Sequence, residues 1–144
     1  MNASLHLIAR VGTCGVLFDA GRVDSVVEVG GIVPAPGAAP AVVGLAAMRS
    51  RVATVIDVRA LFGMTPMRRD GGGGRAVATI VDGHLYAIAV DALEDVATFA
   101  LSPTPTAHGS ASEWDFVTGV ADGIGETLVA VDVDRLVARA SALV

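Results

Sequence analysis

The 144-residue chain has no lysine, no glutamine and a single cysteine, and only 4% of its residues are aromatic. The lone cysteine, Cys14, cannot form an internal disulfide, and it cannot make a zinc site without several other ligands. The ten basic residues are all arginine, and the net charge is −5. Nucleic-acid binding requires clustered cations to neutralise phosphates. We therefore expect no metal or other cofactor, no nucleic-acid partner and a reduced thiol.

The sequence also lacks a convincing membrane segment, although 53% of its residues are apolar and its mean hydropathy is +0.63. The stretch 29–48 carries no charge and is long enough to span a bilayer. It contains three prolines and four glycines, however, and one proline inside a helix costs about 3 kcal/mol. No basic run precedes an apolar one at the N-terminus, so no signal peptide is expected. The composition predicts a folded, soluble domain without membrane insertion.

Short β-branched runs bounded by Gly, Pro, Asp or Ser dominate the chain and predict an all-β fold. Ten runs have the length of a strand: 5–11, 15–18, 23–29, 41–48, 52–58, 76–81, 85–90, 93–99, 116–121 and 127–131. Asp82 and Gly83 predict a tight hairpin, because both residues tolerate positive φ. Two short helices are expected, one N-capped by Asp57 and closed by Gly63, the other within 132–143.

The chain contains an internal repeat. A shift of 75 residues places Gly44 on Gly119 and Asp57 on Asp132, with the same thirteen-residue spacing in both copies. Upstream of these positions, a shift of 70 aligns the apolar residues of 15–29 with a second set. Similarity between unrelated apolar strands would not reproduce the Gly–Asp frame, so the repeat predicts two similar structural units.

Four consecutive glycines separate the two copies, and they predict a flexible linker at 69–74. A phosphate-binding loop would need a Lys-Ser/Thr pair and a helix after the glycines, and neither follows. We expect a first β-barrel over 1–68 and a second over 75–144. Each barrel would contain about five strands followed by a short capped helix.

The candidates for chemistry are few. Asp132 and Asp134 are better explained by helix capping than by a metal site, because side chains two apart on a helix point away from each other. Glu28 interrupts an apolar run, and Arg49 opens a tight turn after the long uncharged stretch. Each is either a solvated charge at a strand end or part of a recognition surface. Arginine suits such a surface because its guanidinium is planar and forked.

The region that contains these residues resembles a known family. Prolines lead to Val-Gly-Leu at 43–45, then to Met-Arg-Ser-Arg-Val at 48–52 and Val-Ile-Asp-Val-Arg at 55–59. This order is similar to the central signature of the CheW-like family, which has an Asn-Leu-Arg-Gly turn and a Val-Ile-Asp-Leu-Arg junction. The resemblance extends, less specifically, over 5–137.

The resemblance implies a fold and a function. The fold would be two tandem five-stranded SH3-like β-barrels with short capping helices, in agreement with the repeat. The function would be that of a non-catalytic, cytoplasmic chemotaxis adaptor in bacteria. Such adaptors couple the cytoplasmic tips of methyl-accepting chemoreceptors to the regulatory domain of the histidine kinase CheA. Nothing in this chain resembles the ATP-binding or phosphotransfer parts of the kinase.

The resemblance also suggests partner-binding residues. Val26 and Glu28 fall on family positions linked to receptor and kinase contact, and Gly44 falls on a structural glycine. Arg49 falls on the arginine of the Asn-Leu-Arg-Gly turn, which is proposed to pair with the glutamate at position 28. We expect these four residues to form or support the partner-binding surface.

Two departures and two alternatives accompany this assignment. Ala47 replaces the family Asn, and Ser50 replaces the Gly that is best suited to positive φ. These changes fit a divergent adaptor of another chemosensory pathway. A module that sequesters the kinase would have the same sequence features. The alternative from another class is a small β-barrel enzyme with Cys14 as its nucleophile.

Overall fold

The computed structural model describes residues 3–34, 39–48, 50–65, 74–103, 115–123 and 125–141. These residues form strands, two α-helices and one short 3-10 helix, η1. The elements are β1 (Ser4–Val11), β2 (Cys14–Asp19), η1 (Ala20–Arg22), β3 (Ser25–Val29), β4 (Ile32–Pro34), β5 (Val42–Met48), β6 (Arg51–Asp57), α1 (Val58–Leu61), β7 (Gly74–Val81), β8 (His84–Val90), β9 (Ala92–Phe99), β10 (Val117–Gly123), β11 (Glu126–Val131) and α2 (Val133–Ser141).

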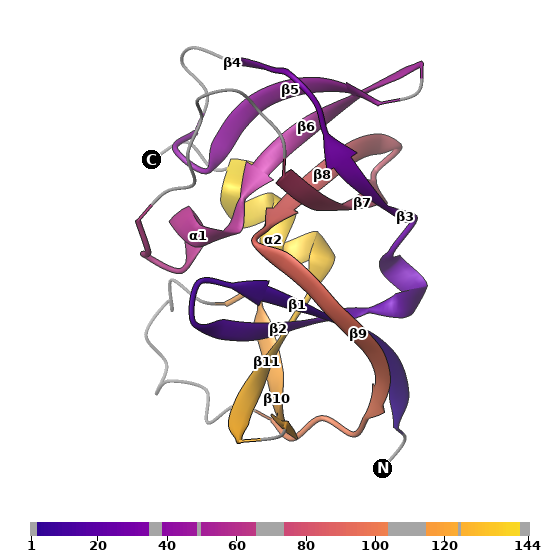
Figure 1. Cartoon of the computed structure of the whole chain (residues 1–144), viewed down its shortest axis with the longest axis vertical. Helices are drawn as coiled ribbons and strands as arrows, with labels where there is room; N and C mark the ends of the chain where they lie inside the picture. Colours follow the sequence, from indigo (N-terminus) through magenta and orange to yellow (C-terminus); the bar gives the residue numbers. More distant parts are fainter. Residues whose placement is uncertain are drawn as a thin grey trace.

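The strands form two curved sheets. One has five strands in the order β10-β11-β2-β1-β9, and the other has six in the order β3-β7-β8-β6-β5-β4. The sheets occupy opposite ends of the molecule, and α2 lies between them (Figure 1). A bridge between Ser102 and Val120 brings the chain after β9 back to β10. We call the two sheets the five-stranded barrel and the six-stranded barrel; they confirm the expected all-β, two-barrel class.

The expected division into a barrel over 1–68 and a barrel over 75–144 is wrong. β1 and β2 lie in the five-stranded barrel with β9 to β11, whereas β7 and β8 lie in the six-stranded barrel with β3 to β6. Each copy of the repeat therefore contributes its first two strands to the sheet of the other copy. Sequence similarity shows which strands are equivalent, but it does not show which copy a strand pairs with. Of the expected linker 69–74, only Gly74, which begins β7, lies within the described residues.

The repeat itself is confirmed by the strand registers. β6 pairs with β8 in parallel through Thr54 and Tyr86, and β11 pairs with β2 in parallel through Val129 and Val16. The two pairs are related by the same shifts of 75 and 70 residues that the sequence shows. Both aspartates of the repeat also have a side-chain oxygen that accepts a backbone N–H at the start of the following helix. The two copies are thus equivalent in pairing and in capping.

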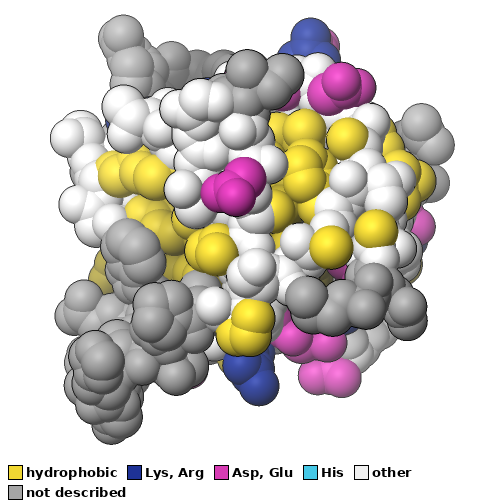
Figure 2. Space-filling model, turned by 90° about the horizontal axis from the view of Figure 1, so that it is seen from below, with side chains coloured by type: hydrophobic (Ala, Val, Ile, Leu, Met, Phe, Trp, Pro, Cys, Tyr) yellow, Lys and Arg dark blue, Asp and Glu magenta, His cyan; other side chains and the backbone are white. Residues whose placement is uncertain are grey.

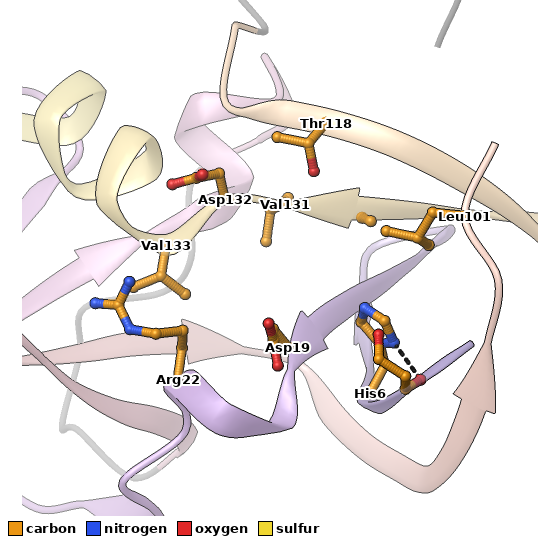
Figure 3. A pocket seen from close by; sticks show the side chains of 10 residues that line it. His6, Asp19, Arg22, Leu101, Thr118, Val131, Asp132 and Val133 are labelled. Atoms are coloured by element: carbon orange, nitrogen blue, oxygen red, sulfur yellow. Dashed lines mark hydrogen bonds between the residues drawn. The ribbon is translucent and has the colours of Figure 1, made fainter. Parts of the chain in front are cut away.

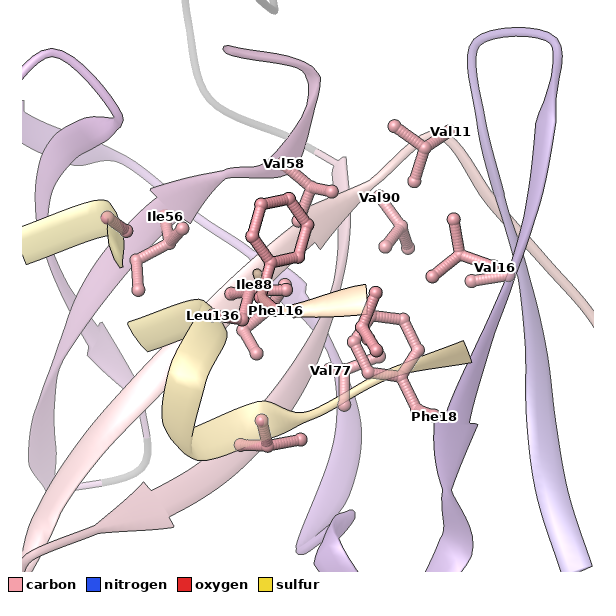
Figure 4. Packing of buried hydrophobic residues seen from close by; sticks show 14 of the residues in the cluster. Val11, Val16, Phe18, Ile56, Val58, Val77, Ile88, Val90, Phe116 and Leu136 are labelled. Atoms are coloured by element: carbon pink, nitrogen blue, oxygen red, sulfur yellow. The ribbon is translucent and has the colours of Figure 1, made fainter. Parts of the chain in front are cut away.

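Three hydrophobic clusters hold the molecule together. The largest lies between the barrels and includes Phe18, Ile88, Phe116 and Leu136 (Figure 4). The other two fill the barrel interiors, and the one inside the six-stranded barrel is built mostly from alanine and valine. Successive residues of one strand face different clusters, as Leu17 and Phe18 do. Most strands therefore bury both faces, which explains their nearly continuous apolar sequence.

Local signals were interpreted correctly at the turns and helices. Asp82 and Gly83 have φ of 51° and 80°, as the predicted β7–β8 hairpin requires. The predicted helices are present as α1 and α2. η1 and β4 were not predicted, because one is very short and the other lies in the proline-rich stretch, ends at Pro34 and pairs only with β5. Within the described part of the chain, no helix is long and apolar enough to cross a membrane.

Candidate functional site

One end of the six-stranded barrel is open. A pocket of about 150 Å³ lies between the start of β3, the ends of β5 and β6 that meet at their turn, and strands β7 and β8. Val27, Met48 and Arg51 are among the residues that line it. A second hollow, of about 280 Å³, adjoins it through Asp24 and is lined in part by Ile80. The strand that bears Val26 and Glu28 and the turn that bears position 49 therefore meet at this opening.

The equivalent end of the five-stranded barrel is closed by charged side chains. The Arg10 guanidinium donates to Glu126 at 2.7 and 2.8 Å and to Glu94 at 2.9 and 3.2 Å. The repeat places Ile80 at the position that corresponds to Arg10. No comparable ion pair joins the described residues around the open end. The same barrel end is thus bridged in one copy and accessible in the other.

The closing network remains charged at neutral pH. The hydrogen bonds from Arg10 lower the pKa of Glu126, and the positive charge of Arg10 lowers it further against a small opposing effect of desolvation. The hydrogen bonds to Glu126 and then to Glu94 raise the pKa of Arg10 beyond its already high ordinary value. Both partners are therefore ionised throughout the neutral range.

Val26 and Glu28 project from the outer face of β3, at an edge of the six-stranded barrel. The Val26 side chain is 44% exposed, and Glu28 is also exposed. In the register with β7, Glu28 lies opposite Arg75 and Val26 lies opposite Val77. Directly opposed charges on neighbouring strands attract each other, so Arg75 is the arginine that the described structure places nearest to Glu28 in the sheet.

Gly44 has a structural role. It is buried in β5, and a Cβ at this position would overlap the carbonyl oxygen of Val33 on β4. Its counterpart Gly119 is similarly close to the chain, with a Cβ meeting the Ser102 carbonyl oxygen at 2.9 Å. Both glycines also adjoin an irregularity in strand register. Gly44 therefore shapes the barrel and presents no side chain to a partner.

Arg49 lies outside the described residues, but its surroundings are defined. Met48 and Arg51 are register partners, so positions 49 and 50 form a two-residue connection between β5 and β6. Ser50 has a φ of 58°, a left-handed conformation that glycine adopts most easily. Gly125, its counterpart in the other copy, has a φ of 73°. The turn at position 50 keeps the left-handed conformation although serine has replaced the family glycine.

Sequence reasoning did not identify the exposed apolar surfaces. Val33, Leu45 and Val52 are 67%, 43% and 63% exposed on the outside of β4, β5 and β6, and Val33 is the register partner of Leu45. Apolar side chains also gather in the middle of the face at the end of the five-stranded barrel (Figure 2). Strand periodicity distinguishes two faces but does not show which of them remains uncovered, so these surfaces required the structure.

The candidate reactive groups are engaged in packing, capping and ion pairing. Cys14 is half-buried and packs against the cluster between the barrels. Asp132 caps α2, and Asp134 accepts hydrogen bonds from Arg22 at 2.8 and 2.9 Å. Among the residues that the structure describes, no group of three or more His, Cys, Asp or Glu could hold a metal ion. What the open end offers is shape, charge and apolar surface for binding.

Comparison with known proteins agrees with this architecture. The model of the CheW-like domain matches residues 6–141. The crystal structure of scaffolding protein TtCheW from Thermoanaerobacter tengcongensis superimposes with a TM-score of 0.78 over 94% of this chain and 92% of that one, at 19% identity. No curated protein matches the sequence. Since the family match spans nearly the whole chain, and the two-barrel fold agrees with it, the chain belongs to the CheW-like domain family.

Proposed function

We propose that the chain is a non-catalytic adaptor that couples bacterial chemoreceptors to a CheA-type histidine kinase. Membership of the CheW-like family supports an adaptor role in chemotaxis, and the similar TtCheW is a scaffolding protein. The observation that carries the proposal is the open end of the six-stranded barrel. There the turn at position 49 meets the strand that carries Val26 and Glu28. The adaptor would work in the cytoplasm, where protein contacts alone link it to receptor arrays.

The proposed mechanism uses two surfaces on one rigid body. Arg49, Val26 and Glu28 would contact the helical tip of the receptor, since an exposed edge with one apolar and two charged groups suits an amphipathic helix. The apolar stripe formed by Val33, Leu45 and Val52 would contact the regulatory domain of the kinase. Two modest interfaces joined in one molecule give a high effective concentration within an array.

The same surfaces are compatible with a module that sequesters the kinase, and with an adaptor of a separate chemosensory pathway. Only binding distinguishes these roles. A sequestering module would bind the kinase without the receptor, whereas an adaptor would bind each separately and increase the amount of receptor that is recovered with the kinase. An enzyme using Cys14 would instead require a reactive thiol, which rapid labelling of the native protein by iodoacetamide would reveal.

The decisive experiment is a pull-down of this chain with kinase alone, receptor alone and both together. The variant Arg49→Ala should lose receptor or kinase coupling while its unfolding free energy stays within about 0.5 kcal/mol of wild type. Arg139→Ala, an exposed position on α2, serves as a matched control and should bind normally. Normal coupling by Arg49→Ala, or its failure to fold, would contradict the assignment of the site.

A further inference from the structure

A polar pocket lies at the end of the five-stranded barrel opposite the Arg10 network. Its volume is about 320 Å³, at the lower end of the range for small-molecule sites. It is formed where β1 begins, β2 ends and β11 leads into α2. His6, Asp19, Arg22, Thr118 and Asp132 are among its lining residues, and they surround a common space (Figure 3).

His6 supplies a buried acceptor to this pocket. The side chain is only 4% exposed, and its Nδ1 lies 2.9 Å from the carbonyl oxygen of Ser4. A carbonyl oxygen can only accept, so Nδ1 carries the proton and Nε2 of the neutral ring has a free lone pair. Nε2 has no hydrogen-bond partner among the described residues, and it faces the space that Asp19 and Leu101 also border (Figure 3). A buried polar group of this kind is costly unless a partner satisfies it.

The pocket has more negative than positive charge. Arg22 is its only cation among the described lining residues, and it is engaged by Asp134 through two hydrogen bonds. The hydrogen bonds to Asp134 raise the pKa of Arg22, and the charges of Asp134, Asp132 and Asp19 add to this against desolvation. Asp19 and Asp132 each accept one backbone N–H, which leaves their remaining oxygens available. The free groups are therefore mainly acceptors.

The fold does not require these polar groups. In the six-stranded barrel the repeat places Ala76 at the position of His6 and Ala89 at the position of Asp19, and both alanines are buried. The counterpart of Thr118 is Val43, which is also buried. One copy thus closes this end with apolar side chains, while the other keeps a polar opening at the same place. The difference points to a bound ligand and not to a structural need.

We propose that this pocket binds a guanidinium or alkylammonium group. Such a group carries the positive charge and the several N–H donors that His6, Asp19 and Asp132 can accept, and it fits the volume available. It could belong to a free amine or to an arginine or lysine side chain of a protein; the recognition chemistry is the same. The proposal concerns a site separate from the open end of the six-stranded barrel and does not depend on the adaptor role.

The test is an NMR titration that follows the ring signals of His6, with the exposed His84 as an internal reference. The probes are agmatine, a Gly-Arg-Gly peptide with blocked ends, and the matching citrulline peptide, which has nearly the same shape without the charge. We expect saturable shifts of the His6 signals with the first two probes and none with the third. Tighter binding of the peptide assigns the group to a protein, and tighter binding of agmatine assigns it to a free amine.

The variant Asp19→Asn should weaken binding about tenfold or more, because an ion-paired hydrogen bond is replaced by a neutral one. Asp122→Asn removes the same charge from an exposed position on β10 and should leave the affinity unchanged. The absence of saturable shifts at His6, equal binding of the citrulline peptide, or equal weakening by both variants would overturn the proposal. The peptide comparison uses the unaltered protein, so it decides the question even if Asp19→Asn does not fold.

Discussion

The two barrels are related by the repeat, yet they differ in which end is closed. The five-stranded barrel is bridged by Arg10, Glu94 and Glu126 at one end and has the polar pocket at the other. The six-stranded barrel is closed by buried alanine and valine at the second end and is open at the first. A duplicated fold supplies both copies with the same backbone, so residues that differ at equivalent places are free to specialise. The comparison therefore locates candidate binding sites without reference to any other protein.

The largest effect is expected in the cluster between the barrels. Leu136 on α2 is fully buried there, whereas its counterpart Leu61 on α1 is only partly buried. Leu136→Ala should lower the unfolding free energy by about 3 kcal/mol, because it removes buried area and leaves a cavity, and Leu61→Ala should cost about 1 kcal/mol. Urea denaturation of both variants measures the difference. Equal losses would show that the two helices are equally important to the core.

The repeated glycines provide the next comparison. Gly44→Ala forces a Cβ against the Val33 backbone and should destabilise the protein by about 2 kcal/mol, while Gly119→Ala, with a less severe overlap, should cost less. Gly30→Ala is the control, since nothing lies within 4 Å of its added Cβ, and it should change stability by no more than about 0.5 kcal/mol. Chemical denaturation of the three variants should reproduce this order. A Gly44→Ala protein as stable as the control would refute the close approach of β4 to β5.

The two equivalent turns should respond in opposite directions. Ser50→Gly relieves a left-handed serine and should stabilise the protein by up to about 1 kcal/mol. Gly125→Ser introduces the same strain in the other copy and should destabilise it by about 1 kcal/mol, because no side-chain contact opposes the change. Thermal unfolding measures both shifts. Shifts of the same sign would mean that the turns are not equivalent.

The smallest effect concerns the ion pair that closes the five-stranded barrel. Arg10 holds the pKa of Glu126 below its ordinary value of 4.5, so this pairing stabilises the fold above that pH. The contribution is lost as the pH falls through the lower pKa of the folded state. The stability difference between wild type and Glu126→Gln should therefore shrink between about pH 6 and about pH 3. The effect is small because the pair is partly exposed. A difference that does not change with pH would exclude this origin.

Much of the fold could be predicted because its signals are local. Alternation and turn residues located ten of the strands, Asp82 and Gly83 marked a hairpin, and Asp57 and Asp132 marked two helix starts. β4 was missed because its three residues end at Pro34, and its pairing depends on the neighbouring strand. The candidate site was predicted only in part. Val26 and Glu28 lie on an exposed strand as expected, Gly44 has a packing role, and Arg49 lies outside the described residues.

The sequence by itself determined the strands, the turns, the caps and the existence of the repeat, since these depend on the preferences of neighbouring residues. Only the tertiary structure decided that each copy gives its first two strands to the other barrel, because strand pairing depends on long-range burial. It also decided which barrel ends are closed. Arg10 meets Glu126 across 116 positions of sequence, and His6 and Asp19 come together with the start of α2 only when both copies fold around a common core.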